Sequence, residues 1–202
     1  MNLFAGQSGT GLEDLLGAFG YTAYTDFYNE QDGTVRVFLD DTSTLRLNSS
    51  GLVQYASTDG SATVSAYDES DITDAAALDA QLDCARLILD AAQRAGDTDT
   101  HASLYAVERS GEQTTLIFLQ MYSGVPVLGD ADFATFVFDG SALRTATIRL
   151  QKFQPTGGKR TVMPAKQATA GASGAERGLM AAYRAQDGQY VPSRFYLKNA
   201  AE

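Results

Sequence analysis

The segment DITDAAALDAQLDCARLILDAAQRA, residues 71–95, decides the fold class that we predict from the sequence. Its apolar residues recur at the spacing of an α-helix, so one face is apolar and the opposite face is charged. The apolar face carries Leu78, Leu82, Ala85, Leu89 and Ala92. Asp90 and Arg94 stand one turn apart, where an ion pair is expected, and Gly96 suits the end of the helix.

Strand-like segments follow this helix and are separated by turn signals. Ser110-Gly111 and Asp139-Gly140 are predicted to be hairpin turns, because glycine accepts the positive φ angle that tight turns require. The strands around them are expected at residues 103–109, 113–122, 133–138 and 143–153. This half of the chain is therefore predicted to be one helix followed by four strands.

The same order of elements is expected nearer the N-terminus. Thr10 and Glu13 fit the capping-box pattern of a helix start, and Gly20 suits the helix end. Strands are expected at residues 21–28, 34–39, 44–47 and 52–56. We therefore predict an α+β fold of two tandem units, residues 1–70 and 71–202. Each unit is expected to have one helix packed on an antiparallel sheet of about four strands.

The C-terminal part of the sequence predicts a closing hairpin. Residues 179–184 fit either a helix or a strand, and we favour a strand that pairs with residues 190–197 across an Asp187-Gly188 turn. Pro192 is expected on an edge strand, because proline cannot donate a hydrogen bond to a ladder. Pro164 suits the first turn of a short helix before the hairpin.

The composition limits the classes of function. The chain of 202 residues has 15 Lys+Arg and 25 Asp+Glu, a net charge of −10. This charge disfavours binding to nucleic acid or to anionic lipid. Its single cysteine, Cys84, excludes an internal disulfide. No apolar run is long enough to span a membrane, and the apolar start at residues 1–6 is expected to follow a membrane segment that was removed.

No residue pattern predicts catalysis. His101 has acidic neighbours but no second histidine, so a surface turn is the better interpretation. Cys84 lacks a neighbouring base, so a packed thiol is expected rather than a nucleophile. Asp130 and Asp132 would share one face of a strand, but no further ligands converge on them in the sequence. We therefore expect a protein that is not an enzyme and that holds no cofactor or metal.

Two short motifs carry a resemblance to a known family. Residues 119–127, LQMYSGVPV, are similar to the Y-x-G-x-P-V strand and turn of PepSY-like domains and of the related membrane-anchored regulators of the YycH/YycI type. Residues 45–55, LRLNSSGLVQY, resemble the matching hairpin of the first half. The closing hairpin of that family usually carries a tryptophan, and this chain has Phe195 or Tyr196 in its place.

The resemblance implies a function as well as a fold. Such proteins are extracytoplasmic, non-enzymatic accessory proteins of Gram-positive bacteria, and they modulate a sensor histidine kinase through protein contacts. A single N-terminal membrane helix anchors them, and Asn2-Leu3-Phe4 resembles the end of that helix. The expected partner is therefore the sensor kinase or a sister accessory protein, with a homodimer as an alternative assembly.

The predicted partner-contact loop is the motif turn, formed by Tyr122, Gly124, Val125 and Pro126. The alternative role of this turn is only to set the direction of the strands. A sheet face or an exposed edge strand is the other kind of surface that we expect to bind a partner, because an extended segment can add main-chain hydrogen bonds there.

Two other functions stay open from the sequence. One is a PepSY-type inhibitor of a secreted protease, or a propeptide-like domain. The other is a secreted enzyme or glycan-binding protein, which requires Asp130 and Asp132 to converge in a cleft.

Overall fold

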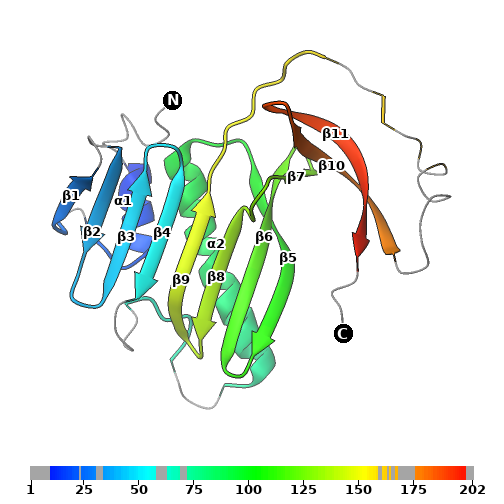
Figure 1. Ribbon diagram of the computed structural model, residues 1–202. Helices are drawn as coiled ribbons and strands as arrows, with labels where there is room; N and C mark the ends of the chain where they lie inside the picture. Colours follow the sequence, from blue (N-terminus) through cyan, green and yellow to red (C-terminus); the bar gives the residue numbers. More distant parts are fainter. Residues whose placement is uncertain are drawn as a thin grey trace.

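The structure is a computed structural model that describes residues 10–22, 24–30, 34–57, 63–68, 72–158, 161–162, 164, 167 and 176–198. Within these residues, two helices lie against one face of a long β-sheet, as Figure 1 shows. α1 spans Thr10–Ala18 and α2 spans Asp74–Gly96. Both predicted helices are confirmed.

The ends of α2 are fixed by their capping residues. Thr73 is the N-cap, and its side chain accepts a hydrogen bond from the backbone N–H of Ala76. Asp97 closes the C-terminus in the left-handed conformation with φ 47°. The predicted pair between Asp90 and Arg94 is wrong, because Arg94 Nε lies 3.6 Å from Asp14 Oδ2 on the neighbouring α1.

Eleven strands form the sheet. They are β1 (Phe27–Glu30), β2 (Val35–Leu39), β3 (Ser43–Asn48), β4 (Leu52–Ser57), β5 (His101–Ser110), β6 (Gln113–Tyr122), β7 (Val125–Leu128), β8 (Ala134–Asp139), β9 (Ala142–Arg149), β10 (Glu176–Gln186) and β11 (Gln189–Lys198). Their order is β1-β2-β3-β4-β9-β8-β6-β7-β10-β11, and β5 pairs with β6 outside this path. At Gln120 and Met121, β6 pairs with β5 on one side and with β7 on the other.

The predicted arrangement of two units, each a helix on about four strands, is wrong. Leu52–Ala56 of β4 pair with Thr145–Arg149 of β9, so the strands of both halves form one sheet. The sheet is mixed, because β10 and β7 run parallel while its other pairs are antiparallel. Strands pair through backbone N–H and C=O groups, which are the same in every residue. The sequence pattern of a strand therefore does not show which other strand it pairs with. The division of the chain at residue 70 stays a prediction.

Three strand predictions also need correction. The first strand begins at Phe27, because the preceding described residues form turns instead. β9 ends at Arg149, and residues 150–153, which were assigned to it, have no regular structure. β7 was not predicted as a separate strand. The expected short helix after Pro164 and the Asn2–Phe4 segment lie wholly or mostly outside the described residues.

The core lies between the sheet and the two helices. Phe19 and Tyr55 stack at 5.2 Å between ring centroids, which joins the end of α1 to β4. Phe118 and Phe136 meet edge to face on β6 and β8. Of the predicted apolar face of α2, Ala85, Leu89 and Ala92 are buried, and Leu78 and Leu82 pack against the core from its margin.

A hydroxyl and carboxylate cluster closes the turn between β2 and β3. Asp40 accepts hydrogen bonds from the backbone N–H groups of Thr42 and Ser43 and from their hydroxyls. Ser43 Oγ also lies 2.7 Å from the buried hydroxyl of Tyr21. Burial raises the pKa of Tyr21 to about 12, although the bond to Ser43 opposes this. The cluster thus ties the segment after α1 to the sheet.

Asp40→Asn is expected to destabilise the protein at neutral pH by about 1 kcal/mol, since Asp40 is exposed and solvent weakens its interactions. Burial raises the pKa of Asp40, but the hydrogen bonds from Thr42 and Ser43 outweigh it, so the pKa lies below its usual range. Because its pKa is lower in the folded state, ionised Asp40 stabilises the folded protein above the unfolded pKa of 3.8. This stabilisation is lost as the pH falls through the folded-state pKa. Urea unfolding at several pH values should show the difference between the two proteins shrink as the pH falls below 3.8. Asp41→Asn is the control, and an equal effect there would contradict the assignment.

Candidate functional site

The predicted contact loop is a two-residue hairpin turn between β6 and β7. Tyr122 pairs with Val125, and the turn residues Ser123 and Gly124 have φ angles of 49° and 75°. Two successive positive φ angles match the twist of a tight hairpin. Ser123 and Gly124 are exposed, while Pro126 is buried. The four predicted residues therefore lie together, but they face different surroundings.

Gly124→Val is expected to lower the free energy of unfolding by about 1–2 kcal/mol, because a β-branched residue resists a positive φ angle. A Cβ atom on Gly124 would meet no atom within 4 Å, so the effect comes from the backbone alone. Gly124→Asn should be milder, because asparagine enters the left-handed region more readily. Thermal unfolding of both variants checks this. If Gly124→Val were as stable as the parent, the turn would not be needed to set the strand direction, and partner contact would be its remaining role.

Tyr122 belongs to a cluster of four aromatic rings. Its ring centroid lies 5.5 Å from Phe153 and 6.1 Å from Tyr183. Phe153 in turn meets Tyr190 at 5.2 Å with nearly perpendicular rings. These residues come from β6, from the segment after β9, and from both strands of the closing hairpin. The cluster therefore joins the hairpin to the main sheet.

A cleft of about 710 Å³ opens over this cluster, and we call it the junction cleft. One wall is the irregular segment Leu150–Gly158, here called the strap, which Figure 1 shows passing the hairpin after β9. The other wall comes from Tyr183, Gln189 and Tyr190 of the hairpin. All four rings of the cluster are partly exposed. The volume falls in the range of ligand-binding clefts.

Hydrogen bonds hold the base of the strap. Gln120 Nε2 donates to Thr100 Oγ1 at 2.9 Å and to the carbonyl of Gln151 at 3.0 Å. Tyr190 Oη donates to Gln151 Oε1 at 2.8 Å. Both of these strap contacts are made through Gln151, and the backbone N–H of Leu150 also donates to the carbonyl of Gly51.

Asp130 and Asp132 lie in the loop between β7 and β8. Both are exposed, and they border a hollow of about 390 Å³ that Tyr105 and Arg184 also line. No three His, Cys, Asp or Glu side chains gather as a metal-binding group within the described residues. Both carboxylates therefore lie at the rim of an open hollow, exposed to solvent, and do not converge in a cleft.

The two other candidate residues stand apart from these surfaces. Cys84 is partly buried on α2, and burial raises the pKa of its thiol to about 11. Such a thiol is almost entirely protonated at neutral pH and is a poor nucleophile. His101 is exposed at the first position of β5, beside Met121 of β6.

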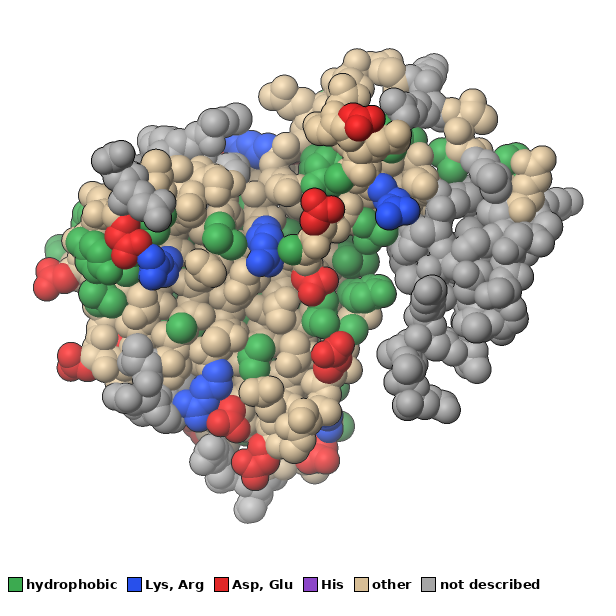
Figure 2. All heavy atoms as spheres, in the orientation of Figure 1, with side chains coloured by type: hydrophobic (Ala, Val, Ile, Leu, Met, Phe, Trp, Pro, Cys, Tyr) green, Lys and Arg blue, Asp and Glu red, His purple; other side chains and the backbone are tan. Residues whose placement is uncertain are grey.

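β5 forms one margin of the sheet. It pairs with β6 on one side, and no strand among the described residues pairs with its other side. Leu104, Tyr105 and Val107 are 38%, 52% and 37% exposed, and Figure 2 shows hydrophobic side chains gathered along this margin. Unpaired main-chain groups beside exposed apolar side chains form a template for strand addition.

A bulge divides this margin. The register with β6 shifts between Leu104 and Ala106, so Tyr105 is the extra residue. Leu104 and Val107 pair with the core-facing Phe118 and Leu116, and they therefore lie on the helix-covered face. Tyr105 instead borders the hollow with Leu119 on the open face. The free edge thus exposes apolar side chains on both faces of the sheet.

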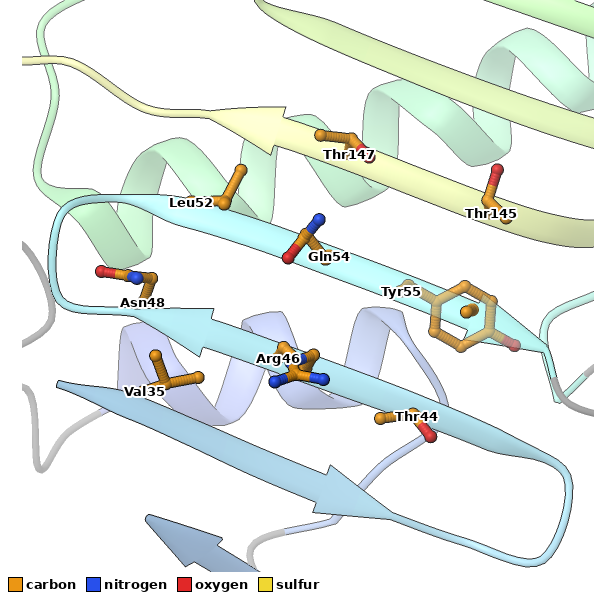
Figure 3. A pocket seen from close by; sticks show the side chains of 10 residues that line it. Val35, Thr44, Arg46, Asn48, Leu52, Gln54, Tyr55, Thr145 and Thr147 are labelled. Carbon is orange, nitrogen blue, oxygen red and sulfur yellow. The ribbon is translucent and has the colours of Figure 1, made fainter. Parts of the chain in front are cut away.

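The open face of the sheet also carries a shallow polar trough of about 700 Å³. Figure 3 shows Arg46, Gln54 and Thr147 rising from three neighbouring strands on the side away from the helices. The guanidinium of Arg46 is paired with the carboxylate of Glu30. The trough therefore offers hydroxyl and amide groups rather than a free charge.

Comparison with known proteins bears on the fold. No protein-family model matches the chain, and no curated protein matches it. Its structure is similar to the Bacillus megaterium YpeB C-terminal domain, with a TM-score of 0.52 and 10% sequence identity. The match covers 94% of this chain and 85% of the other. The likeness supports a PepSY-like fold.

The comparison confirms only the coarser part of the resemblance. The YpeB domain comes from a PepSY-containing family, whereas nothing in the comparison supports the YycH/YycI type. At 10% identity the likeness concerns the fold alone. No helix among the described residues is long and apolar enough to cross a membrane.

Sequence reasoning named only part of the junction cleft. Tyr122 was recognised through its motif, but Phe153, Tyr183 and Tyr190 were assigned only to strands. The available signal was the breaker run Pro155-Thr156-Gly157-Gly158, which ends regular structure after an aromatic residue. Long-range packing of the hairpin against the strap has no such local signal.

Proposed function

We propose that this protein is a non-enzymatic, extracytoplasmic regulatory module that binds a partner protein by strand addition at β5. The observation that supports the proposal most directly is the free edge of β5, with Leu104, Tyr105 and Val107 exposed beside it. Main-chain hydrogen bonds would give affinity, and the side chains on both faces would give specificity.

The stretch after the bulge suits strand addition best. Ala106–Ser110 pair with β6 without interruption, so the outer edge of this stretch is regular. Glu108 and Arg109 lie within it and carry opposite charges. A partner strand would therefore meet the apolar Ala106 and Val107 and then the charged Glu108 and Arg109, an order that favours one register.

The finer identity of the partner comes from the resemblance. We propose a sensor histidine kinase or a sister accessory protein at the cell membrane, with the chain held there by an N-terminal anchor. The PepSY-like fold also accommodates the alternative of a protease inhibitor, and an edge strand is a surface that either kind of partner can use.

The double variant Leu104→Lys/Val107→Lys is expected to reduce partner capture at least tenfold, because two charges on the free edge oppose strand addition. The experiment is a crosslinking pull-down from membranes of the source organism, read by mass spectrometry. Leu87→Lys is the matched control, since Leu87 is 59% exposed on α2, away from the edge.

The identity of the captured protein decides between the functions. A sensor kinase or sister protein that is lost with the double variant and kept with Leu87→Lys supports the proposal. A secreted protease favours the inhibitor, and glycan without protein favours a carbohydrate-binding role. Equal capture by the parent and the double variant removes β5 as the binding surface.

A further inference from the structure

The strap presents its main chain to the junction cleft. Every residue from Leu150 to Gly158 lines the cleft, and Gly157 and Gly158, which have no side chains, do so through main-chain atoms. No main-chain hydrogen bond joins Lys152–Gly158 to another residue in the described part of the chain. An irregular segment with free N–H and C=O groups can pair with an extended peptide, as an edge strand does.

The aromatic cluster supplies an apolar surface beside this main chain. The rings of Tyr122, Phe153, Tyr183 and Tyr190 are each partly buried, so each keeps an exposed portion. Their perpendicular contacts fix them in place before a ligand arrives. Fixed aromatic rings bind apolar side chains with little loss of conformational entropy.

Among the described residues that line it, the cleft carries no unpaired charge. Lys152 is the one charged residue among the described residues of its lining, and its Nζ lies 3.0 Å from Asp97 Oδ2. The remaining polar lining comes from amides and hydroxyls such as those of Gln154, Thr156 and Gln189. In a chain of net charge −10, this neutral site disfavours a strongly charged ligand, because a charge would lose hydration without gaining a partner.

We propose that the junction cleft binds an extended, uncharged peptide segment of a partner protein. The segment pairs with the main chain of the strap and places an apolar side chain against Phe153 and Tyr190. The free main chain favours a peptide over a saccharide, because a saccharide has no repeating donor and acceptor pattern to match it. This site is separate from β5 and does not require that the proposed regulatory function be correct.

The test uses an array of capped heptapeptides of varied, uncharged sequence, with matched arrays that carry two lysines or two glutamates. We expect the protein to retain a subset of the uncharged peptides, and Phe153→Ala to weaken that binding at least tenfold. N-methylation of the bound peptides should weaken binding similarly, since it removes main-chain donors. Tyr24→Ala is the matched control, because Tyr24 is 96% exposed and does not line the cleft.

A second measurement separates binding from folding. Phe153→Leu keeps apolar volume in the cluster and should retain more binding than Phe153→Ala. Hydrogen exchange of the strap amides should slow when a retained peptide is added, which a purely structural role of Phe153 would not produce. The β5 variant Leu104→Lys/Val107→Lys should bind the array as the parent does, so failure of one proposal leaves the other intact.

Several results would overturn the inference. On the array, the protein would retain none of the uncharged peptides, or would prefer the charged ones, or Phe153→Ala would bind as the parent does. In the exchange experiment, a retained peptide would fail to slow hydrogen exchange of the strap amides. Binding of N-acetylglucosamine oligomers that Phe153→Ala abolishes, without peptide binding, would assign the cleft to a saccharide instead.

Discussion

Phe136→Ala is expected to lower the free energy of unfolding by about 3–5 kcal/mol. Phe136 is fully buried on β8, and its ring lies 5.8 Å from that of Phe118 in an edge-to-face contact. β8 lies between β9 and β6, so the cavity would open in the middle of the sheet. Because β8 is hydrogen-bonded to a strand on each side, it cannot shift to fill the cavity. The loss of stability therefore includes the whole cost of the empty volume.

Urea unfolding measures this effect, with two further variants as references. Thr135→Ala changes the residue before Phe136 on β8, which faces the open side of the sheet, and it should change stability by less than about 1 kcal/mol. Phe136→Leu should fall between the two because it keeps most of the buried surface. Equal midpoints for Phe136→Ala and Thr135→Ala would show that the core is not packed as described.

Gly20→Ala is expected to lower the free energy of unfolding by about 2–4 kcal/mol, from backbone strain and a steric clash together. Gly20 follows α1 with a φ angle of 80°, and the neighbouring Tyr21 N–H donates to the carbonyl of Leu16. A Cβ atom at Gly20 would lie 2.6 Å from Cγ2 of Thr63. The clash would push Thr63 away from the hydroxyl and carboxylate cluster around Asp40.

A double variant separates the two causes. Thr63→Ser removes Cγ2 but keeps the hydroxyl, so Gly20→Ala/Thr63→Ser should recover about half of the lost stability. Gly17→Ala is the control, since Gly17 lies within α1 and a Cβ there meets no atom within 4 Å. That change should stabilise by about 0.5–1 kcal/mol through helix propensity. If the double variant were no more stable than Gly20→Ala, the clash with Thr63 would contribute nothing to the loss of stability.

The two proposed binding surfaces lie on different parts of the fold. β5 is a regular strand at the margin of the sheet, whereas the strap is an irregular segment beside the closing hairpin. β6 connects them, because it pairs with β5 and also carries Tyr122 into the aromatic cluster.

Local sequence predicts the motif turn but not the rest of the candidate site. Gly124 has the positive φ angle that a glycine in a tight turn predicts. The placement of Tyr122 against Phe153 and Tyr183 depends instead on how β10 meets β7, through the pairs of Tyr183 with Val127 and Arg184 with Leu128. Those contacts join residues about sixty positions apart, and no local pattern encodes them.

The sequence by itself determined both helices, most of the strands and the tight turns. These features depend on apolar spacing and glycine conformations that act over a few residues, as along α2 and at Gly124 and Gly188. Only the tertiary structure decided that β4 and β9 join both halves into one sheet, that β5 keeps a free edge, and that the strap and hairpin enclose a cleft. Strand pairing uses main-chain groups that every residue shares, so the choice of partner edges comes from packing of the whole chain.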